Sequence, residues 1–189
     1  MPQWVHRSFA AATRAACLAL LCWGAPAWCA PPANEYQVKA VYLFNFGQFV
    51  EWPATAYESA DSPFVIGIVG DDPFGRALED VVRGESLNGR TLVVKRFADP
   101  ASIDACNIVF VGRNESALLD RTLRTLQGRS VLTVTDIAGA EHRGAVIALV
   151  NENQRIRMRI NLAAAKANNL VISSKLLRPA EIVGAEGNR

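Results

Sequence analysis

The stretch FVIGIVGDDPFG, residues 64–75, decides the class of fold. Its first seven residues, FVIGIVG, carry no charge and end in a glycine-containing loop. A short run that is apolar throughout is typical of a strand buried on both faces of a sheet, because such a strand needs apolar side chains on both sides. We therefore predict a strand over 64–70 and a helix over 73–83.

The same alternation of strand and helix continues along the chain. Asn107 begins the run NIVFVG (107–112), which is followed by a predicted helix over 116–126, and further strands are predicted for TLVVKRF (91–97) and SVLTVT (130–135). Apolar strands that alternate with helices are typical of a mostly parallel sheet covered by helices on both faces.

The C-terminal part has a different pattern. GAVIALV (144–150) and QRIRMRI (154–160) flank the polar residues 151–153, which predicts a hairpin. Asn161 is expected to cap a helix over 162–168, and Ser173 to start a short one after a last strand over 170–172. The predicted fold class is α/β, with a mostly parallel central sheet, helices on both faces and an antiparallel C-terminal hairpin.

Residues 1–30 have the three parts of a secretory signal peptide. An 11-residue apolar core, 15–25, follows a basic start and precedes APAWCA, where cleavage after Ala27 or Ala30 is expected. That core is shorter than the roughly 20 apolar residues that span a bilayer. We expect export to the periplasm, a single domain over 31–189, and no direct membrane insertion after cleavage.

Charge balance limits the partners. The chain has 20 basic and 18 acidic side chains, and removing Arg7 and Arg14 with the signal leaves 18 of each. Nucleic acid and anionic membranes attract proteins through an excess of basic charge, which the exported domain lacks. We therefore expect no nucleic acid as a partner.

Side chains suited to catalysis are scarce. His142, in the loop AEHRG, is the one histidine beyond residue 30, and no G-x-S-x-G motif accompanies it. A solvated loop histidine is the preferred interpretation, since a catalytic base needs an orienting partner, and a hydrolase built around His142 is the alternative. The sequence has no C-x-x-C motif and no paired histidines. We expect no catalytic residue, no metal site and no cofactor.

The loop GDDPFG (70–75) lies where a parallel sheet binds ligands, just beyond the carboxyl end of a strand. It lacks the Lys-Ser/Thr pair of a phosphate-binding loop. A receiver domain would need a third aspartate where this chain has Gly112 and Arg113. We prefer a strand-to-helix turn capped by Asp71 or Asp72, with a small-molecule site as the alternative.

Cys106 is the one cysteine clearly beyond the signal peptide, so an internal disulfide is not expected. It begins the apolar stretch CNIVFVG, which favours a buried, unreactive thiol. Intermolecular pairing through Cys106 is the alternative interpretation.

The aromatic segment VKAVYLFNFGQFVEWP (38–53) is predicted to form a helix that Pro53 ends. A membrane span is disfavoured by its length and by Lys39 and Glu51. Core packing is preferred over a surface for another protein, because aromatic residues at helical spacing usually fill cores. Both hold if the helix also has an outward face, for which Tyr42, Phe46 and Trp52 are the candidates.

The strand QRIRMRI alternates in charge. Arg155, Arg157 and Arg159 fall on one face, opposite Ile156 and its apolar neighbours. Three guanidinium groups about 7 Å apart can receive an acidic partner surface or a carboxylate ligand. The alternative is that charge at a sheet edge discourages unwanted pairing.

Three stretches together resemble the YfiR family of periplasmic proteins: KAVYLFNFGQFVEWP, CNIVFVG and INLAAAKANNLVISSKLLRPAEIV. The resemblance implies a small α/β domain without catalytic activity. It also implies a regulator that represses an inner-membrane diguanylate cyclase by binding its periplasmic sensor region, and so controls cyclic di-GMP and biofilm formation. Disulfide control in the family is not carried over to this chain, because Cys106 has no mature partner unless Cys29 remains after signal cleavage.

From these observations we predict a non-enzymatic periplasmic regulator of an inner-membrane sensor protein, either a diguanylate cyclase or a histidine kinase. A periplasmic small-molecule-binding module that feeds such a sensor is the alternative, and a homodimer is a further expected assembly. The candidate partner-binding residues are Tyr42, Phe46, Trp52, Glu152, Arg155, Arg157, Arg159 and Lys175.

Overall fold

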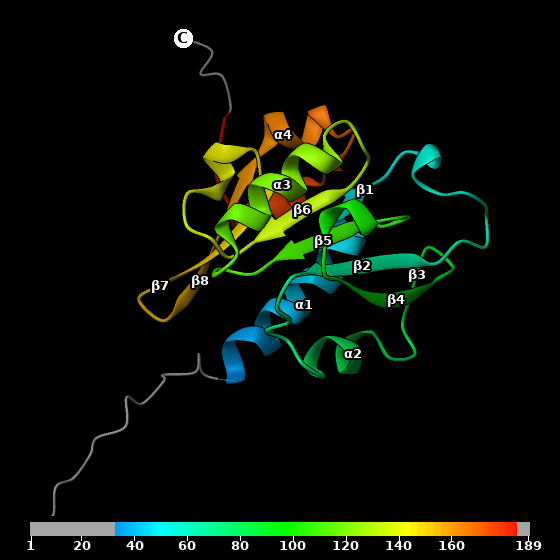
Figure 1. Ribbon diagram of the computed structural model, residues 1–189, viewed down its shortest axis with the longest axis horizontal. Helices are drawn as coiled ribbons and strands as arrows, with labels where there is room; N and C mark the ends of the chain where they lie inside the picture. The colour runs from blue at the N-terminus through cyan, green and yellow to red at the C-terminus, as the bar shows by residue number, and fades with distance from the viewer. Residues whose placement is uncertain (1–32, 185–189) are drawn as a thin grey trace, which may run out of the picture. The chain divides into compact units, whose positions relative to one another are not determined.

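The computed structural model describes residues 33–184, with side chains from residue 35 onward, and the predicted signal peptide lies outside this range. Most strands form one eight-stranded sheet with the order β10-β8-β7-β6-β5-β2-β4-β3 (Figure 1). The strands of this sheet are β2 (Phe64–Val69), β3 (Ser86–Leu87), β4 (Arg90–Phe97), β5 (Ile108–Val111), β6 (Leu132–Thr135), β7 (Ile147–Glu152), β8 (Arg155–Asn161) and β10 (Glu181–Val183).

Five α-helices and a second, two-stranded sheet complete the described chain. The helices are α1 (Ala33–Phe49), α2 (Ala77–Val82), α3 (Ser116–Leu126), α4 (Leu162–Ala167) and α5 (Ser174–Leu177). Short 3-10 helices lie at Ala54–Ala56 (η1), Pro100–Ser102 (η2) and Ala140–Arg143 (η3). The small sheet pairs β1 (Val50–Glu51) with β9 (Val171–Ile172) in antiparallel orientation.

The predicted fold class is confirmed. From β4 through β2, β5 and β6 to β7, each neighbouring pair of strands is parallel, whereas β8 runs antiparallel to β7. The predicted turn at 151–153 is wrong, because Asn151 and Glu152 belong to β7. The turn consists of Asn153 and Gln154, which have φ angles of 51° and 62°. Positive φ at both central residues matches the twist of a two-residue hairpin.

The sheet has a hydrophobic layer on each face. One layer joins α1 and α2 to alternate strand residues such as Ile66, Phe110 and Leu149. The other packs Leu119 and Leu126 of α3 against the alternate set on the opposite face. Strands covered on both faces are apolar throughout, which explains why all residues of β2, β5 and β6 are buried.

Helix ends depart from the sequence prediction. α1 ends at Phe49 and not at Pro53, because Val50 and Glu51 pair with β9. α2 begins at Ala77 and not at residue 73, because the preceding Phe74 is buried against Phe110 with ring centroids 4.7 Å apart. α3 has the predicted bounds. The side chain of Asn161 caps α4, accepting a hydrogen bond from the Ala164 N–H as expected.

Candidate partner-binding surface

Two adjoining hollows lie between α1 and β8. The first, of about 480 Å³, is bordered by Val38 and Tyr42 on the helix and by Arg155 on the hairpin. The second, of about 380 Å³, lies further along β8 at Arg157 and Met158, and it also includes Glu152. Tyr42 and Ile156 line both. We call the combined feature the α1–hairpin groove, and it unites four predicted residues: Tyr42, Glu152, Arg155 and Arg157.

The three arginines of β8 differ in their partners. Arg159 is bound by three carboxylates, with its guanidinium nitrogens 2.7 Å from Glu152, 3.0 Å from Glu181 and 3.7 Å from Glu141. Arg155 and Arg157 are exposed and form no ion pair within residues 35–184. Two of the predicted cations are thus free to meet an acidic surface, whereas Arg159 holds neighbouring elements together.

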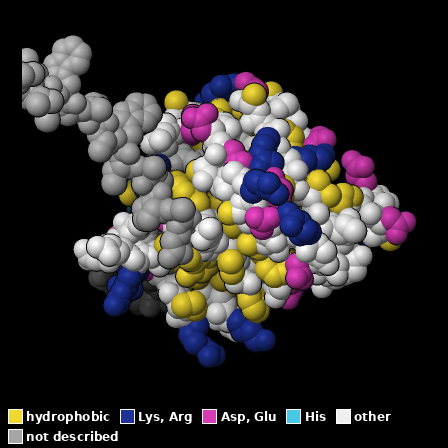
Figure 2. All heavy atoms as spheres, turned by 90° about the horizontal axis from the view of Figure 1, so that it is seen from below, with side chains coloured by type: hydrophobic (Ala, Val, Ile, Leu, Met, Phe, Trp, Pro, Cys, Tyr) yellow, Lys and Arg dark blue, Asp and Glu magenta, His cyan; other side chains and the backbone are white. Residues whose placement is uncertain are grey.

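The helix side of the groove is apolar. Val38 and Val41 are 40% and 45% exposed, which is unusual for valine, and Tyr42 is half-buried beside them. In the view from below, onto the end of the molecule where α1 begins and α2 lies, hydrophobic side chains gather in one area with basic and acidic side chains around it (Figure 2). Apolar side chains at the centre with cations at the rim are the composition expected of an interface.

The other predicted residues lie elsewhere. Phe46 is fully buried in the core beneath α1, so its assignment to the outward face is wrong. Trp52 is half-buried, packs edge-on against Phe64 at 4.9 Å, and donates a hydrogen bond from Nε1 to the Asn107 carbonyl at 3.2 Å. Lys175 is exposed on α5 and lines neither hollow. Partner contacts by Trp52 and Lys175 stay predictions.

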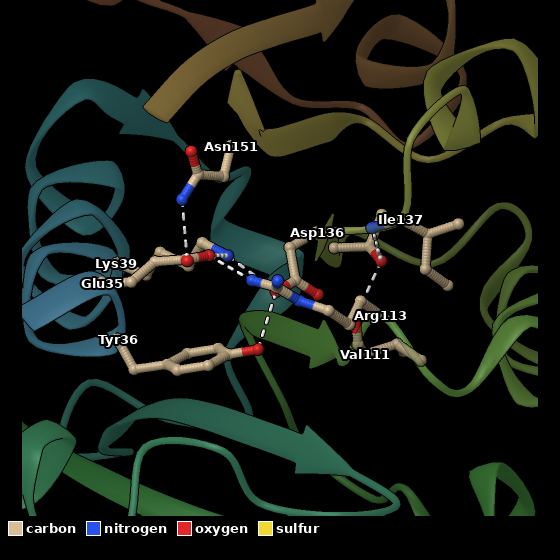
Figure 3. A network of polar contacts seen from close by, with 9 residues as sticks. Glu35, Tyr36, Lys39, Val111, Arg113, Asp136, Ile137 and Asn151 are labelled. Carbon is tan, nitrogen blue, oxygen red and sulfur yellow. Dashed lines mark hydrogen bonds and ion pairs between the residues drawn. The ribbon is translucent and has the colours of Figure 1, made fainter. Parts of the chain in front are cut away.

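A buried charge network lies beside the groove. Lys39, which is fully buried, places Nζ 2.5 Å from a Glu35 oxygen and 2.7 Å from an Asp136 oxygen (Figure 3). Arg113 contacts both carboxylates, and the hydroxyl of Tyr36 donates to Asp136 at 3.0 Å. Two cations therefore compensate two buried anions, which is how such charges are tolerated in a protein interior.

Topology brings this network together. Arg113 and Asp136 follow the carboxyl ends of β5 and β6, which meet at one edge of the sheet because the strands are parallel. Glu35 and Lys39 reach that edge from the first turns of α1. The network touches the groove, since Asn151 donates to Glu35 at 2.8 Å and both residues line the first hollow. In the sequence, the only local indication of this network is that Glu35 and Lys39 lie four residues apart, a spacing that lets two side chains pair on a helix.

The carboxyl of Glu35 has a lowered pKa in the folded protein. Burial alone would raise the pKa of its carboxyl, but hydrogen bonds from Lys39 and Asn151 and the charges of Lys39 and Arg113 lower it below the ordinary value. A pKa that is lower in the folded state stabilises the fold above the unfolded pKa, and this contribution is lost as the pH falls through the folded pKa.

We expect the free energy of unfolding to drop below about pH 4.3, the ordinary pKa of glutamate. The Glu35→Gln variant should show a shallower decrease over this range. Urea titrations of both proteins from pH 6 to pH 3 (roughly the span of carboxylate titration) measure the difference. Parallel pH profiles for the two proteins would contradict the assigned pKa shift.

Cys106 is buried between strands. Its thiol donates to the Ile108 carbonyl at 3.0 Å, and its exposed fraction is 7%. Burial raises the pKa of this thiol to about 12. Gly67 accommodates it, because a Cβ on that glycine would lie 2.8 Å from the sulfur. This geometry agrees with a buried, unreactive thiol, and intermolecular pairing is open to a direct test.

We expect native protein to resist iodoacetamide at pH 8, because the thiolate is the reactive species and burial suppresses it. Mass spectrometry should find modification of Cys106 only after denaturation, and the denatured sample is the control for reagent activity. A disulfide-linked dimer formed by native protein would contradict this expectation.

His142 and the loop over 70–75 contact neighbouring polar side chains in the described part of the chain. The imidazole is 68% exposed on η3, with its Nε2 3.6 Å from Glu141, and no serine or cysteine of the described chain bonds to it. In the loop, Asp72 accepts a hydrogen bond from the Phe74 N–H and pairs with Arg96 of β4, which ties the loop to the neighbouring strand. The prediction that Asp71 or Asp72 caps α2 is wrong, since no side chain caps that helix.

Two further observations concern residues 33–184 only. No group of three or more His, Cys, Asp or Glu side chains is placed there to hold a metal ion. None of the helices in this part is long and apolar enough to cross a membrane.

The described part of the chain is an α/β domain with a groove that the exposed Val38 and the arginines Arg155 and Arg157 line. The chain belongs to the YfiR/HmsC-like family, whose family model matches residues 36–181. The resemblance predicted from the sequence is thus confirmed. The family is one of regulatory proteins, which places the chain among regulators at the level of the family. No curated protein matches the chain.

Proposed function

We propose that the chain is a non-enzymatic periplasmic regulator that binds and represses the periplasmic sensor region of an inner-membrane signalling protein. The proposed target is a diguanylate cyclase, so that repression lowers cyclic di-GMP and biofilm formation, and a histidine kinase is the alternative sensor. The proposed mature form is residues 31–189, released from a signal peptide over 1–30. Family membership supports this role.

The observation that carries the proposal is the juxtaposition of free cations and exposed apolar side chains in the α1–hairpin groove. Arg155 and Arg157 have no ion pair within the described chain, and the exposed Val38 lines the same hollow as Arg155. Tyrosine, tryptophan and arginine side chains supply much of the affinity at protein interfaces, and Tyr42 lines the groove together with Arg155 and Arg157. A domain with balanced charge needs such a local patch, because its overall field attracts no partner.

Repression requires selectivity between two states of the sensor. A bound protein shifts a conformational equilibrium only by the difference between its affinities for the two conformations. The groove therefore has to fit the inactive conformation of the sensor better than the active one. Both walls of the groove have internal ion pairs that hold them in place, since Lys39 of α1 pairs with Asp136 and Arg159 of β8 pairs with Glu152.

The test is charge reversal in the groove. We expect the Arg155→Glu/Arg157→Glu variant to bind the periplasmic sensor region of the proposed diguanylate cyclase at least about tenfold more weakly, because like charges replace complementary ones. Cyclic di-GMP in cells should rise to the level seen without the regulator. The measurements are affinity for the purified sensor region and cellular cyclic di-GMP.

The matched control is Arg124→Glu/Lys166→Glu, which makes the same change in net charge at exposed positions on α3 and α4, outside the groove. This control should bind and repress as the unaltered protein does. If the folded groove variant also retains full binding and repression, the groove is not the regulatory surface.

A further inference from the structure

The outer edge of β8 has backbone groups without a strand partner. The N–H of Asn161 donates to the Val146 carbonyl at 2.9 Å, so these two residues form a hydrogen-bonded pair of the antiparallel ladder. Such pairs alternate along a ladder. The register of β7 and β8 then directs the backbone groups of Arg155, Arg157 and Arg159 toward β7, and those of Ile156 and Met158 away from it.

The last strand of the chain covers only part of this edge. β10 pairs in parallel with residues 159–161 of β8, beginning with Glu181 opposite Arg159. A strand that begins there reaches no further back than the Met158 carbonyl. The N–H of Met158 and both backbone groups of Ile156 are therefore without a strand partner in the described chain.

Pro179 explains why β10 does not continue. The parallel register would place this residue opposite Arg157, two positions before the Glu181–Arg159 pair. Proline has no N–H to donate to a ladder, and it ends or excludes a strand at such a position. The chain turns away instead, and the second hollow of the groove, about 380 Å³, occupies the place beside β8 between Tyr42 and Pro179.

The two faces of this open edge differ in chemistry. On one face Arg155 and Arg157 are exposed and unpaired within residues 35–184. On the other, Ile156 and Met158 lie against Tyr42 of α1 at the second hollow. An added strand alternates its side chains between the same two faces. Its acidic side chains would meet the arginines while its apolar side chains enter the hollow.

The chain contains one example of this arrangement. Glu181 lies opposite Arg159 in the register of β10 and β8, and its carboxylate is 3.0 Å from the Arg159 Nε. An acidic side chain on the strand beside β8 therefore already pairs with one of the three arginines of β8. The two arginines that precede Arg159 in β8, Arg157 and Arg155, lack the equivalent acid because β10 begins only opposite Arg159.

We propose that the open edge of β8, at residues 155–158, binds an extended segment of the partner protein as an added strand, with acidic and apolar side chains in alternation. The proposal rests on the proposed function, because it names the chemistry of the partner at the same groove. Main-chain hydrogen bonds supply affinity in such strand addition, and alternate side chains supply specificity.

The experiment uses the exported protein and the peptide Ser-Glu-Val-Glu-Val-Glu-Ser, blocked at both ends and labelled for fluorescence anisotropy. We expect saturable binding, and in NMR hydrogen exchange about tenfold slower exchange of the Met158 and Ile156 amides. The Arg155→Glu/Arg157→Glu variant should bind this peptide roughly tenfold more weakly and should prefer a peptide with Lys in place of Glu.

A second peptide, Ser-Glu-Glu-Glu-Val-Val-Ser, has the same composition without alternation and should bind roughly tenfold more weakly than the first. N-methylation of alternate peptide residues can be made in two patterns, at the odd-numbered or at the even-numbered residues. One pattern should abolish binding and the other should leave it unchanged, since only one of these two sets of N–H groups faces β8. Equal binding of the two peptides, or protection of amides elsewhere, would overturn the proposal.

The two proposals fail differently. If neither peptide binds while the groove variant still loses the sensor, strand addition is overturned and the proposed function stands. If the alternating peptide protects the β8 edge while the groove variant still represses the sensor, strand addition at β8 is supported. The proposal that the α1–hairpin groove is the regulatory surface is then contradicted.

Discussion

Replacing Lys39 by methionine is expected to lower the free energy of unfolding by about 3–5 kcal/mol, the usual cost of removing one partner from a buried ion pair. Lys39 is fully buried, and its ammonium lies between the carboxylates of Glu35 and Asp136. Without it, Arg113 alone faces two carboxylates, and one oxygen of Asp136 already lacks a hydrogen-bond partner within the described chain. Urea unfolding followed by circular dichroism measures the change.

Lys95→Met is the matched control for this prediction. Lys95 pairs with Asp104 at the surface, where both side chains are substantially exposed, so its removal should cost less than about 1 kcal/mol. The double variant Lys39→Met/Glu35→Gln should be less destabilised than the sum of its single changes, because the two residues interact directly. A loss below about 1 kcal/mol for Lys39→Met would show that the network does not stabilise the fold.

Phe46→Ala is expected to cost about 3–5 kcal/mol, because it removes an entire buried ring from the core under α1. Phe46 has no exposed surface and packs 6.0 Å from the Tyr42 ring. For a domain of this size the loss corresponds to a fall in Tm of roughly 10 °C. Thermal unfolding of the purified protein measures it.

Val41→Ala separates this effect from partner binding. Val41 lies on the same helix but is 45% exposed, so its truncation should change Tm by less than about 2 °C. It should nevertheless weaken binding of the sensor region, since Val41 belongs to the exposed apolar area beside the groove. If Phe46→Ala keeps the stability of the unaltered protein and loses only sensor binding, the core placement of Phe46 is contradicted.

The main strands could be predicted because most of them contain a run of consecutive apolar residues, which shows directly in the sequence. FVIGIVG and NIVFVG are apolar throughout because both faces of these strands are covered. β10 was not predicted, and nothing in its three residues distinguishes it from a loop. Its pairing depends on β8, a strand distant in sequence, through the contact of Glu181 with Arg159.

The candidate site was predictable in part. Alternation in QRIRMRI placed Arg155 and Arg157 on one face correctly, because strand periodicity is local. Periodicity could not rank the faces of α1, since that helix is apolar almost all round, and Phe46 was therefore assigned outward while it faces the core. It also could not distinguish Arg159, whose three carboxylates come from η3, β7 and β10.

The sequence by itself determined the α/β class, the order of the main strands and helices, the hairpin and the family, because these depend on local periodicity and on motifs read along the chain. Only the tertiary structure decided the charge network around Lys39, the groove between α1 and β8, and which arginines are free. These features join residues up to 116 positions apart, as Glu35 and Asn151 are. Contacts over such separations form only when the parallel sheet brings the ends of its strands to one edge.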